Sequence, residues 1–322
     1  MNMNKYVCLL LLGAGLLIHL ASIPLLQLDP LDGDARQFYQ EAENIKNGIG
    51  WVNTEGPGQA TATYPSQVIF LLICKYIFGD YDIQGALVLQ HLLVLATALI
   101  VLKLALLLFN SRKVAILSSS IIIFFPHMIY YSNILYSHIL GMFLSVLSVY
   151  LLMKNNKIKT YYYPVIGMLW AAATMARFTF QFFVPLYLLI SGILILKKKE
   201  KNRLKAALKP LLFLAGFLVL MLPWHIRVSS SGAGNYGYSG VWEIAYKYTR
   251  EPRLRGNPRD DFQIELRDRN LSVSEQEEIY RRKVLQNITE HPAWFINNCL
   301  TNISYLTVNL SKNAQRHMAV YT

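Results

Sequence analysis

Two acidic residues near the N-terminus have a spacing that could support proton transfer. Asp32 and Asp34 stand in the sequence Leu-Asp-Gly-Asp-Ala-Arg, directly after a long apolar run. A carboxylate at a membrane surface can act as a general base when one of its oxygens reaches an acceptor hydroxyl in a partly desolvated cleft. Asp34 also stands three residues before Gln37, in the arrangement of a helix capping box. Asp34 is therefore a candidate catalytic base, with helix capping as the alternative.

Histidine and cysteine form no recognisable metal or redox motif in the sequence. No HxxxH or HExxH spacing occurs. The cysteines Cys8, Cys74 and Cys299 are scattered and odd in number, which argues against a disulfide framework and a CxxC site. The sequence thus predicts no cofactor with any specificity, and it leaves a divalent metal open.

The composition indicates an integral membrane protein. Of the 322 residues 54% are hydrophobic and 16% are charged, and the mean hydropathy is +0.31, which lies outside the range of soluble domains. The net charge of +12 could suggest nucleic acid, but basic residues that flank apolar runs set the membrane topology and contact anionic lipid. Membrane lipids are therefore the expected partners of this charge, and nucleic acid is not.

Seven apolar runs are each expected to cross the membrane as a helix. A hydrocarbon core of about 30 Å needs roughly 20 helical residues. The first run is interpreted as an uncleaved anchor, with a signal peptide cut near Ala21 as the alternative. The expected fold is an all-α polytopic membrane protein with about seven transmembrane helices. The expected spans are residues 6–28, 84–109, 114–131, 134–153, 161–175, 178–196 and 207–224.

The basic residues between these spans set the expected orientation, because short cytoplasmic loops retain Lys and Arg. In the seven-span topology one side holds Lys5, the pair 112–113, the lysines of 154–159 and a cluster at 197–209, and Glu200 is the only acidic residue there. That side is expected to be the cytoplasm. The polar regions on the opposite side are therefore expected to face outward.

The first outward region, the loop 29–83, is expected to hold two helices in the membrane interface. Its second stretch, residues 66–78, is apolar but too short to span. Both helices are expected to lie flat in the interface. The first is indicated by four apolar residues at the spacing of one helix face, Phe38, Ala42, Ile45 and Ile49.

The second outward region, residues 225–322, is expected to be an extracytoplasmic C-terminal segment. A helical pattern begins at Ser274, and residues 292–310 contain too many Asn residues to predict an eighth span. The domain prediction is a transmembrane domain at 1–224, which includes the outer loop 29–83, followed by this C-terminal region.

Several short motifs along the chain stand in a characteristic order. They are Gly33-Asp34-Ala35 with Tyr39, Ala42 and Asn44, Gly48-Ile49-Gly50, Tyr64-Pro65-Ser66, Tyr76-Ile77-Phe78-Gly79, Phe125-Pro126 with Tyr130-Tyr131-Ser132, Ala176-Arg177-Phe178, Leu222-Pro223-Trp224-His225-Ile226-Arg227 and Glu290-His291-Pro292. In this order, over most of the chain, they resemble the GT-C superfamily of membrane glycosyltransferases. The resemblance is to its branch of bacterial dolichyl-phosphate-mannose-protein mannosyltransferase-like proteins (family 39).

The resemblance implies an enzyme that takes a sugar from a polyprenyl-phosphate donor and transfers it to a lipid, glycan or protein acceptor. It places Asp34 at the acidic position that such enzymes use as the base, with Asp32 beside it as a substrate contact. Some members of the superfamily use a divalent metal and others do not. The expected location is the cytoplasmic (inner) membrane, with the active face extracytoplasmic.

A phosphate leaving group would need cations, and arginine recognises phosphate through two parallel hydrogen bonds. Arg177 and Arg227 both fall at the outward ends of predicted spans, so they are the stronger candidates for substrate binding. Arg36 and Lys75 in the first loop are weaker candidates. The alternative is that a basic side chain near a span end only extends its charge to the interface.

Two histidines are further candidates for substrate contact. His138 stands where the family often has an acidic residue, which is a departure from its pattern, and His225 stands close to Arg227. A lone histidine within a membrane is more commonly hydrogen-bonded between helices. That structural role is the interpretation of His19 and His91.

Aromatic residues in the outward regions could stack on a sugar ring. Tyr64 is the one predicted as substrate-binding, and Tyr236, Tyr238 and Trp242 are similar candidates. The alternative is the aromatic belt that Tyr and Trp form at both membrane interfaces.

The tail after Trp224 is shorter than in most members of this family. A compact branch, a fragment of a longer enzyme and a degenerate copy all remain open. Two other functional classes compete with the enzyme. A transporter or flippase of lipid-linked sugars would require polar spans and broken helices, whereas the predicted spans are nearly free of charge apart from Lys103. In a non-catalytic envelope protein Asp34 would only cap a helix.

Overall fold

The computed structural model describes residues 5–52, 65–154, 159–197, 203–230, 241–251, 262, 271 and 273–308, and its regular structure is helical. The chain divides into two compact units, residues 1–231 and 232–322. Helix α10 continues past Trp224 to Ser230. The functional division predicted at residue 224 stays a prediction.

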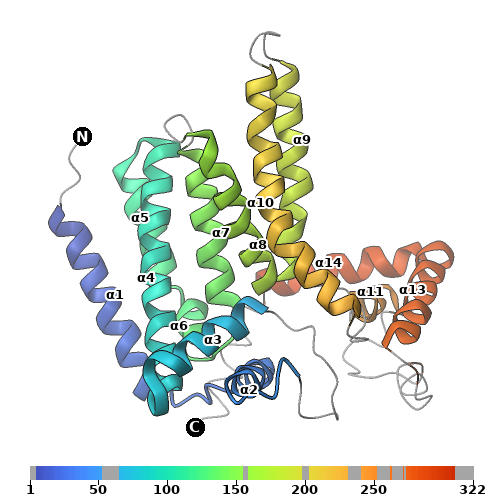
Figure 1. Ribbon diagram of the computed structural model, residues 1–322, viewed down its shortest axis with the longest axis horizontal. Coiled ribbons are helices and arrows are strands. Elements are labelled where there is room, and N and C mark those ends of the chain that lie inside the picture. Colours follow the sequence, from blue (N-terminus) through green and yellow to red (C-terminus); the bar gives the residue numbers. More distant parts are fainter. Residues whose placement is uncertain are drawn as a thin grey trace. The chain divides into compact units, whose positions relative to one another are not determined.

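The first unit is a bundle of long helices with two shorter helices across one end (Figure 1). Helix α4 is central, because it packs against α1, α5 and α7, while α8 packs against α7 and α10. The helices are α1 (Lys5–Leu26), α2 (Asp34–Lys46), α3 (Pro65–Phe78), α4 (Asp82–Phe109), α5 (Arg112–Phe124), α6 (Pro126–Ser132), α7 (His138–Met153), α8 (Tyr163–Ala176), α9 (Phe183–Leu196) and α10 (Arg203–Ser230). Short 3-10 turns lie at Gly79–Tyr81, Thr160–Tyr162 and Phe178–Phe182.

Six of the seven predicted spans each overlap one α-helix and the span 114–131 is divided between α5 and α6, but not every helix is long enough to cross a membrane. Among the described residues, four helical segments have the necessary length and apolarity, and a fifth is added if α5 and α6, bent by 46°, form one span. Helices α7 and α8 have 16 and 14 residues, fewer than the roughly 20 that a full crossing needs. The all-helical membrane fold is thus confirmed with four or five candidate spans, and the seven-span topology is not.

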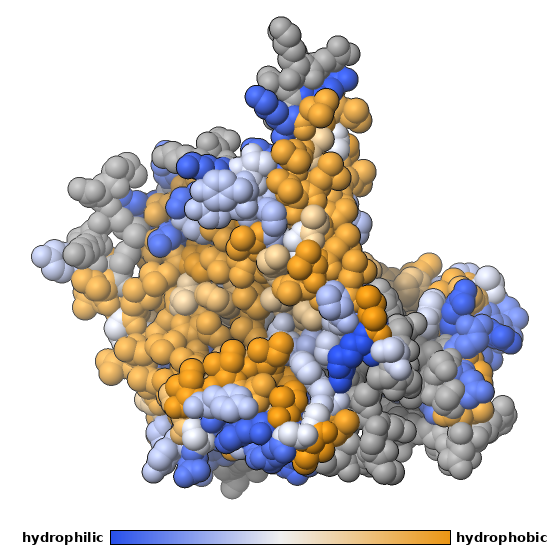
Figure 2. Space-filling view, viewed as in Figure 1, coloured by the Kyte–Doolittle hydropathy of each residue, from blue (hydrophilic) through white to orange (hydrophobic). Residues whose placement is uncertain are grey.

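The described basic loop residues lie at the end of the bundle away from α2 and α3. Alternating helix directions place the last turns of α4, α7 and α9 and the first turns of α5, α8 and α10 toward that end (Figure 1). At or near these turns lie the Arg112–Lys113 pair, Lys154, Lys159 and Lys197. Figure 2 shows apolar side chains over the flank of the bundle between its polar ends. This segregation agrees with the predicted orientation, which itself stays a prediction.

The break between α5 and α6 is stabilised by a histidine from another helix. Pro126 begins α6 and lacks the backbone N–H that would continue the helix. His19 Nε2 of α1 lies 3.0 Å from the carbonyl oxygen of Ile123, the last turn of α5. His19 Nδ1 lies 2.8 Å from His91 Nδ1 of α4. The predicted role of both histidines in helix packing is confirmed.

Side-chain amides hold the connection between α6 and α7. Gln90 Nε2 of α4 donates to the carbonyl oxygens of Ser132 and Ile134 at 3.3 and 2.9 Å. Gln67 Nε2 of α3 donates to the carbonyl of Leu135 at 2.9 Å. Because a buried carbonyl without a partner costs about 1–3 kcal/mol, these amides fix the path of a non-helical segment inside the bundle.

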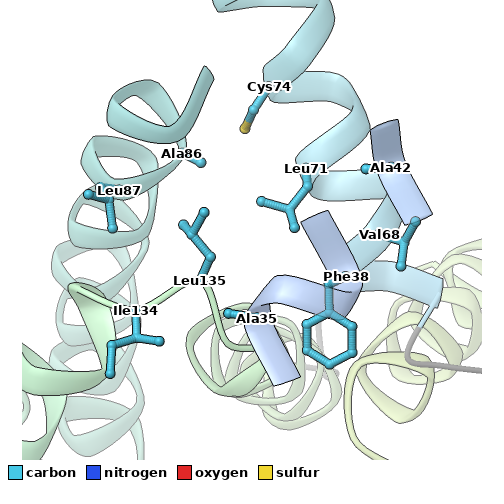
Figure 3. Close-up of a cluster of buried hydrophobic side chains, with 10 residues drawn as sticks. All are labelled: Ala35, Phe38, Ala42, Val68, Leu71, Cys74, Ala86, Leu87, Ile134 and Leu135. Atoms are coloured by element: carbon cyan, nitrogen blue, oxygen red, sulfur yellow. The ribbon is translucent and has the colours of Figure 1, made fainter. Parts of the chain in front are cut away.

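Helix α2 packs on α3 through the apolar face that the sequence predicts. Ala35, Phe38 and Ala42 are buried in one cluster with residues of α3, α4 and the α6–α7 connection, and Leu135 extends between α3 and α4 (Figure 3). Ile45 packs at the edge of this cluster. Ile49 lies beyond the end of α2 and is 61% exposed. The amphipathic helix is confirmed, except that it ends before Ile49.

The second unit contains α11 (Val241–Thr249), α13 (Val273–Glu290) and α14 (Pro292–Val308). Tyr246, Tyr280 and Val284 form its buried cluster. The Asn298 side chain of α14 donates to the carbonyl of Tyr248 at 3.0 Å. The helical pattern predicted from Ser274 is confirmed by α13.

Helices α8 and α10 approach closely through a pair of glycines. A Cβ atom at Gly167 would meet the backbone carbonyl of Phe213, and one at Gly216 would meet the carbonyl of Pro164. Small residues permit such close backbone contact between membrane helices. The contact is stabilised by van der Waals packing, because the hydrophobic effect does not drive helices together in lipid. This crossing joins the half of the bundle that carries Arg177 to the helix that carries Arg227.

A single methyl group at this crossing should destabilise the bundle. We expect Gly167→Ala to lower the free energy of unfolding by about 1–3 kcal/mol through overpacking, measured as a lower midpoint of thermal unfolding in detergent. Gly192 of α9 has no atom within 4 Å of an added Cβ, so Gly192→Ala is the matched control. The control should be neutral or stabilising, since Ala favours helix. Equal effects of the two substitutions would contradict the close crossing.

Candidate functional site

The carboxylate of Asp34 stands at the start of α2 with its side chain exposed. The N-cap residue is Gly33, with φ 54° and ψ −130°, and no side chain makes a capping hydrogen bond there. The capping-box interpretation is therefore wrong: Asp34 is already the first helical residue. Its negative charge still suits the positive end of the helix dipole.

The turn before α2 is docked on the α6–α7 connection. The backbone N–H of Leu135 donates to the carbonyl of Pro30 at 2.9 Å. A Cβ atom added to Gly33 would lie 2.5 Å from the hydroxyl oxygen of Tyr136. Buried surroundings raise the pKa of the Tyr136 phenol, and the negative charges of Asp32 and Asp34 raise it further. The two carboxylates and this phenol therefore share one electrostatic environment.

Tyr136 leads directly to two other predicted residues. Its ring lies 5.5 Å from the ring of His138, and His138 stacks on Tyr131 with 4.6 Å between centroids and 6° between planes. Arg177, at the end of α8, is near enough to His138 to act on its charge. The Nδ1 atom of His138 is buried and has no hydrogen-bond partner among the described residues. The structure thus gathers Asp32, Asp34, His138 and Arg177 at one end of the bundle.

Arg36 does not join this group in the structure. Its guanidinium donates to Asp29 at 3.3 Å, and both side chains are more than half exposed. A surface ion pair of this kind contributes at most about 1 kcal/mol. Arg36 remains able to exchange this partner for another anion.

Lys75 of α3 lies in a buried cluster with Glu43 and Tyr39 of α2 and Asp82 of α4. Its side chain is 1% exposed, and Nζ forms ion pairs with Asp82 at 2.8 Å and with Glu43. The ammonium also lies 3.4 Å from the centre of the Tyr39 ring, and the Tyr39 hydroxyl donates to Asp82 at 2.9 Å. This pairing favours a structural role for Lys75 over the predicted substrate contact.

Arg227 packs against two tryptophans that also contact each other, with 4.9 Å between their ring centroids. Its guanidinium carbon lies 5.1 Å from the Trp51 ring and 4.9 Å from the Trp224 ring, and Nη2 donates to the Trp51 carbonyl at 3.0 Å. The indole of Trp51 donates to Glu41, a fully buried carboxylate of α2, at 2.9 Å. Arg227 thus ties the segment that follows α2 to α10. His225 lies half-buried in the same helix.

The sequence analysis does not predict Glu41 as a site residue, although its position in the sequence indicates a buried carboxylate. It stands three residues after Phe38 and one before Ala42, so it falls on the buried face of α2. Gln37 also donates to it at 3.2 Å. A carboxylate on the apolar face of an amphipathic helix predicts a polar partner inside the fold.

The remaining predicted residues lie elsewhere or outside the description. Tyr64, Tyr236 and Tyr238 lie outside the described residues, and Trp242 packs at the edge of the cluster of the second unit. Within the described ranges, no group of three or more His, Cys, Asp or Glu side chains is placed to hold a metal ion.

Comparison with known proteins identifies the central part of the chain. The model of the dolichyl-phosphate-mannose-protein mannosyltransferase family matches residues 65–226, which is half of the chain. The match includes His138 and Arg177 and begins after α2, so it does not include Asp34. No curated protein and no solved structure matches the chain significantly.

Removing the buried ammonium should strongly destabilise the protein. Lys75→Met would leave Asp82 buried without a counter-charge, a change that costs about 3–5 kcal/mol in comparable pairs. We expect a thermal midpoint lower by roughly 10 °C in detergent. Lys46→Met in the same region, where the side chain is exposed, is the control and should change the midpoint little. A midpoint unchanged by Lys75→Met would show that the ion pairs do not form.

The same cluster should make stability depend on acid pH. The hydrogen bond from Lys75 holds the pKa of Glu43 below its ordinary value. A lowered pKa means that ionised Glu43 stabilises the fold above its unfolded-state pKa of about 4.3, and that this contribution disappears as the pH falls through the lower folded value. We expect the thermal midpoint of Glu43→Gln to fall less than that of the wild type between pH 6 and pH 3, measured at matched ionic strength. Parallel curves would contradict this.

Proposed function

Because the chain belongs to the dolichyl-phosphate-mannose-protein mannosyltransferase family, we propose that it transfers a sugar from a polyprenyl-phosphate donor with Asp34 as the general base. Family membership makes the protein a multi-pass membrane glycosyltransferase that uses a lipid-phosphate sugar. The proposal adds the base, the leaving-group contact and the side of the membrane. The acceptor is a hydroxyl of a lipid, a glycan or a protein.

The reaction needs the base, the acceptor hydroxyl and the anomeric carbon of the sugar in line. An acceptor hydroxyl lies between the Asp34 carboxylate and the anomeric carbon of the sugar, and its oxygen forms the new bond as the bond to the phosphate oxygen breaks. Asp34 takes the hydroxyl proton, and the polyprenyl phosphate leaves with the electron pair of the broken bond. Attack from the side opposite the leaving group inverts the anomeric centre.

The observation that supports this role is the position of Asp34. It stands exposed in the first turn of α2, where no side chain makes a capping hydrogen bond, and the turn that carries it is docked on the segment leading to His138. An acid that only capped a helix would be the N-cap residue. The absence of a capping hydrogen bond from Asp34 therefore supports a role other than N-capping.

The guanidinium of Arg177 supports placing the donor phosphate at the end of the bundle that carries Asp34. Arg177 ends α8 beside His138, and a guanidinium there can neutralise the charge that develops on the leaving phosphate. His138 replaces the acidic residue that the family often has, so a neutral or cationic contact takes the place of an anionic one. Asp32 and His225 are the secondary candidates for contacting the sugar or the acceptor.

We further propose that this end faces outward from the cytoplasmic membrane. The basic connections lie at the opposite end of the bundle, and short cytoplasmic loops retain Lys and Arg. A polyprenyl-phosphate head group sits at the membrane surface, so a base presented there needs no path through the hydrocarbon core. The short helices α2 and α3 are suited to that interface.

Replacing Asp34 tests the role of the base directly. We expect Asp34→Asn to reduce release of polyprenyl phosphate by at least about 100-fold, because the amide keeps the size of the side chain but cannot accept the proton. The assay uses protein reconstituted in vesicles, a panel of polyprenyl-phosphate sugars and an envelope lipid extract as acceptor. Asp80→Asn, an exposed acid after α3, is the matched control and should keep wild-type turnover.

The outcomes separate the parts of the proposal. Equal turnover in the wild type and in Asp34→Asn would remove Asp34 from the mechanism while leaving the enzyme class intact. Absence of turnover with every donor, in folded protein supplied with acceptor, would instead support a non-catalytic member of the family.

A further inference from the structure

Tyr136 contacts the turn that presents Asp34, although it comes from a distant part of the chain. Gly33 has φ +54° in this turn, and a Cβ atom there would lie 2.5 Å from the Tyr136 hydroxyl oxygen. Glycine is thus needed at position 33 for two reasons, the backbone conformation and the space that the phenol occupies. The three heavy atoms nearest to that added atom all belong to Tyr136.

The backbone that carries Tyr136 is held on both sides. Leu135 donates its N–H to Pro30 in the Asp34 turn, and its carbonyl accepts from Gln67 of α3. Gln90 of α4 donates to the carbonyl of Ile134. Because these hydrogen bonds hold the segment in place, the phenol of Tyr136 contacts the Gly33 turn from a fixed position.

The chemistry of a phenol fits a carboxylate base. Its O–H can donate one hydrogen bond to an ionised carboxylate, which orients the carboxylate oxygens and leaves the other lone pairs to accept a proton. Burial raises the pKa of Tyr136, and the negative charges of Asp32 and Asp34 raise it further, so the phenol keeps the proton that it can donate. The ring itself is fixed by its neighbours Tyr131, at 6.2 Å, and His138, at 5.5 Å.

We propose that Tyr136 is a positioning residue of the transfer reaction, whose phenol fixes the Gly33 turn and orients the Asp34 carboxylate toward the acceptor hydroxyl. This inference rests on the proposed function of Asp34. Tyr136 acts through Asp34 and does not exchange a proton with the substrate. It also makes the α6–α7 connection part of the catalytic end.

The test removes only the hydroxyl. We expect Tyr136→Phe to lower kcat about tenfold, the loss typical of one hydrogen bond to a charged group, with KM for the polyprenyl-phosphate sugar within about twofold of the wild type. The thermal midpoint should be unchanged, since the ring and its packing remain. Tyr81→Phe, a tyrosine that is 73% exposed in the turn after α3, is the control and should behave as the wild type.

A second comparison asks whether the two residues act as one unit. Adding Tyr136→Phe to Asp34→Asn should cause no further loss of the residual rate, because there is then no base to orient. Gly33→Ala should resemble Tyr136→Phe in its kcat, since the methyl group displaces the phenol from the turn.

Each other outcome overturns the inference. Wild-type kcat in Tyr136→Phe, together with an inactive Asp34→Asn, would reject the positioning role and leave the proposed function standing. A fall in kcat with a matching loss of thermal stability, or an independent further loss in the double variant, would assign Tyr136 to folding alone. Wild-type activity in Asp34→Asn would reject the proposed base, and with it the role of Tyr136.

Discussion

The arrangement of the proposed catalytic end depends on a positive charge that is shielded from water. Lys75 is 1% exposed, and such an ammonium is tolerated only where carboxylates compensate it. Asp82 supplies one from the start of α4, and Glu43 supplies another from α2. The pair of contacts therefore connects α2, α3 and α4 at one point. Since Asp34 begins α2, the position of the proposed base follows from where this lysine can be neutralised.

Polar side chains inside the bundle form hydrogen bonds with the backbone of its non-helical segments. Gln90 and Gln67 bind carbonyls of the α6–α7 connection, and His19 binds the carbonyl left at the end of α5. In a lipid environment water cannot satisfy such groups, so a helix break persists only where a neighbouring helix provides the partner. Polar residues in predicted spans thus mark where the chain departs from helix, and the site is built at one of those departures.

The sequence predicts the elements of this fold better than their mutual contacts. The apolar spacing of Phe38 and Ala42 is local, so the helix and its buried face could be predicted from it. The neutralisation of Lys75 involves Glu43, which is 32 residues away, and the contact of Tyr136 with Gly33 crosses about a hundred residues. Such pairs leave no local periodicity. The count of seven spans is not confirmed for another reason, because apolarity alone does not show that α7 and α8 end after 16 and 14 residues.

The contact between His19 and His91 fixes where their hydrogen atoms lie. His19 Nε2 faces the carbonyl of Ile123, which has no proton to give, so this nitrogen carries the hydrogen. In a neutral ring the Nδ1 of His19 then presents a lone pair, and His91 must donate from its own Nδ1. The two rings consequently hold opposite tautomers, and the series of hydrogen bonds runs in one direction, from α4 through α1 to α5. Two identical residue types are therefore chemically distinct, and exchanging their tautomers would reverse the hydrogen bond between the rings and leave the Ile123 carbonyl facing the lone pair of His19 Nε2.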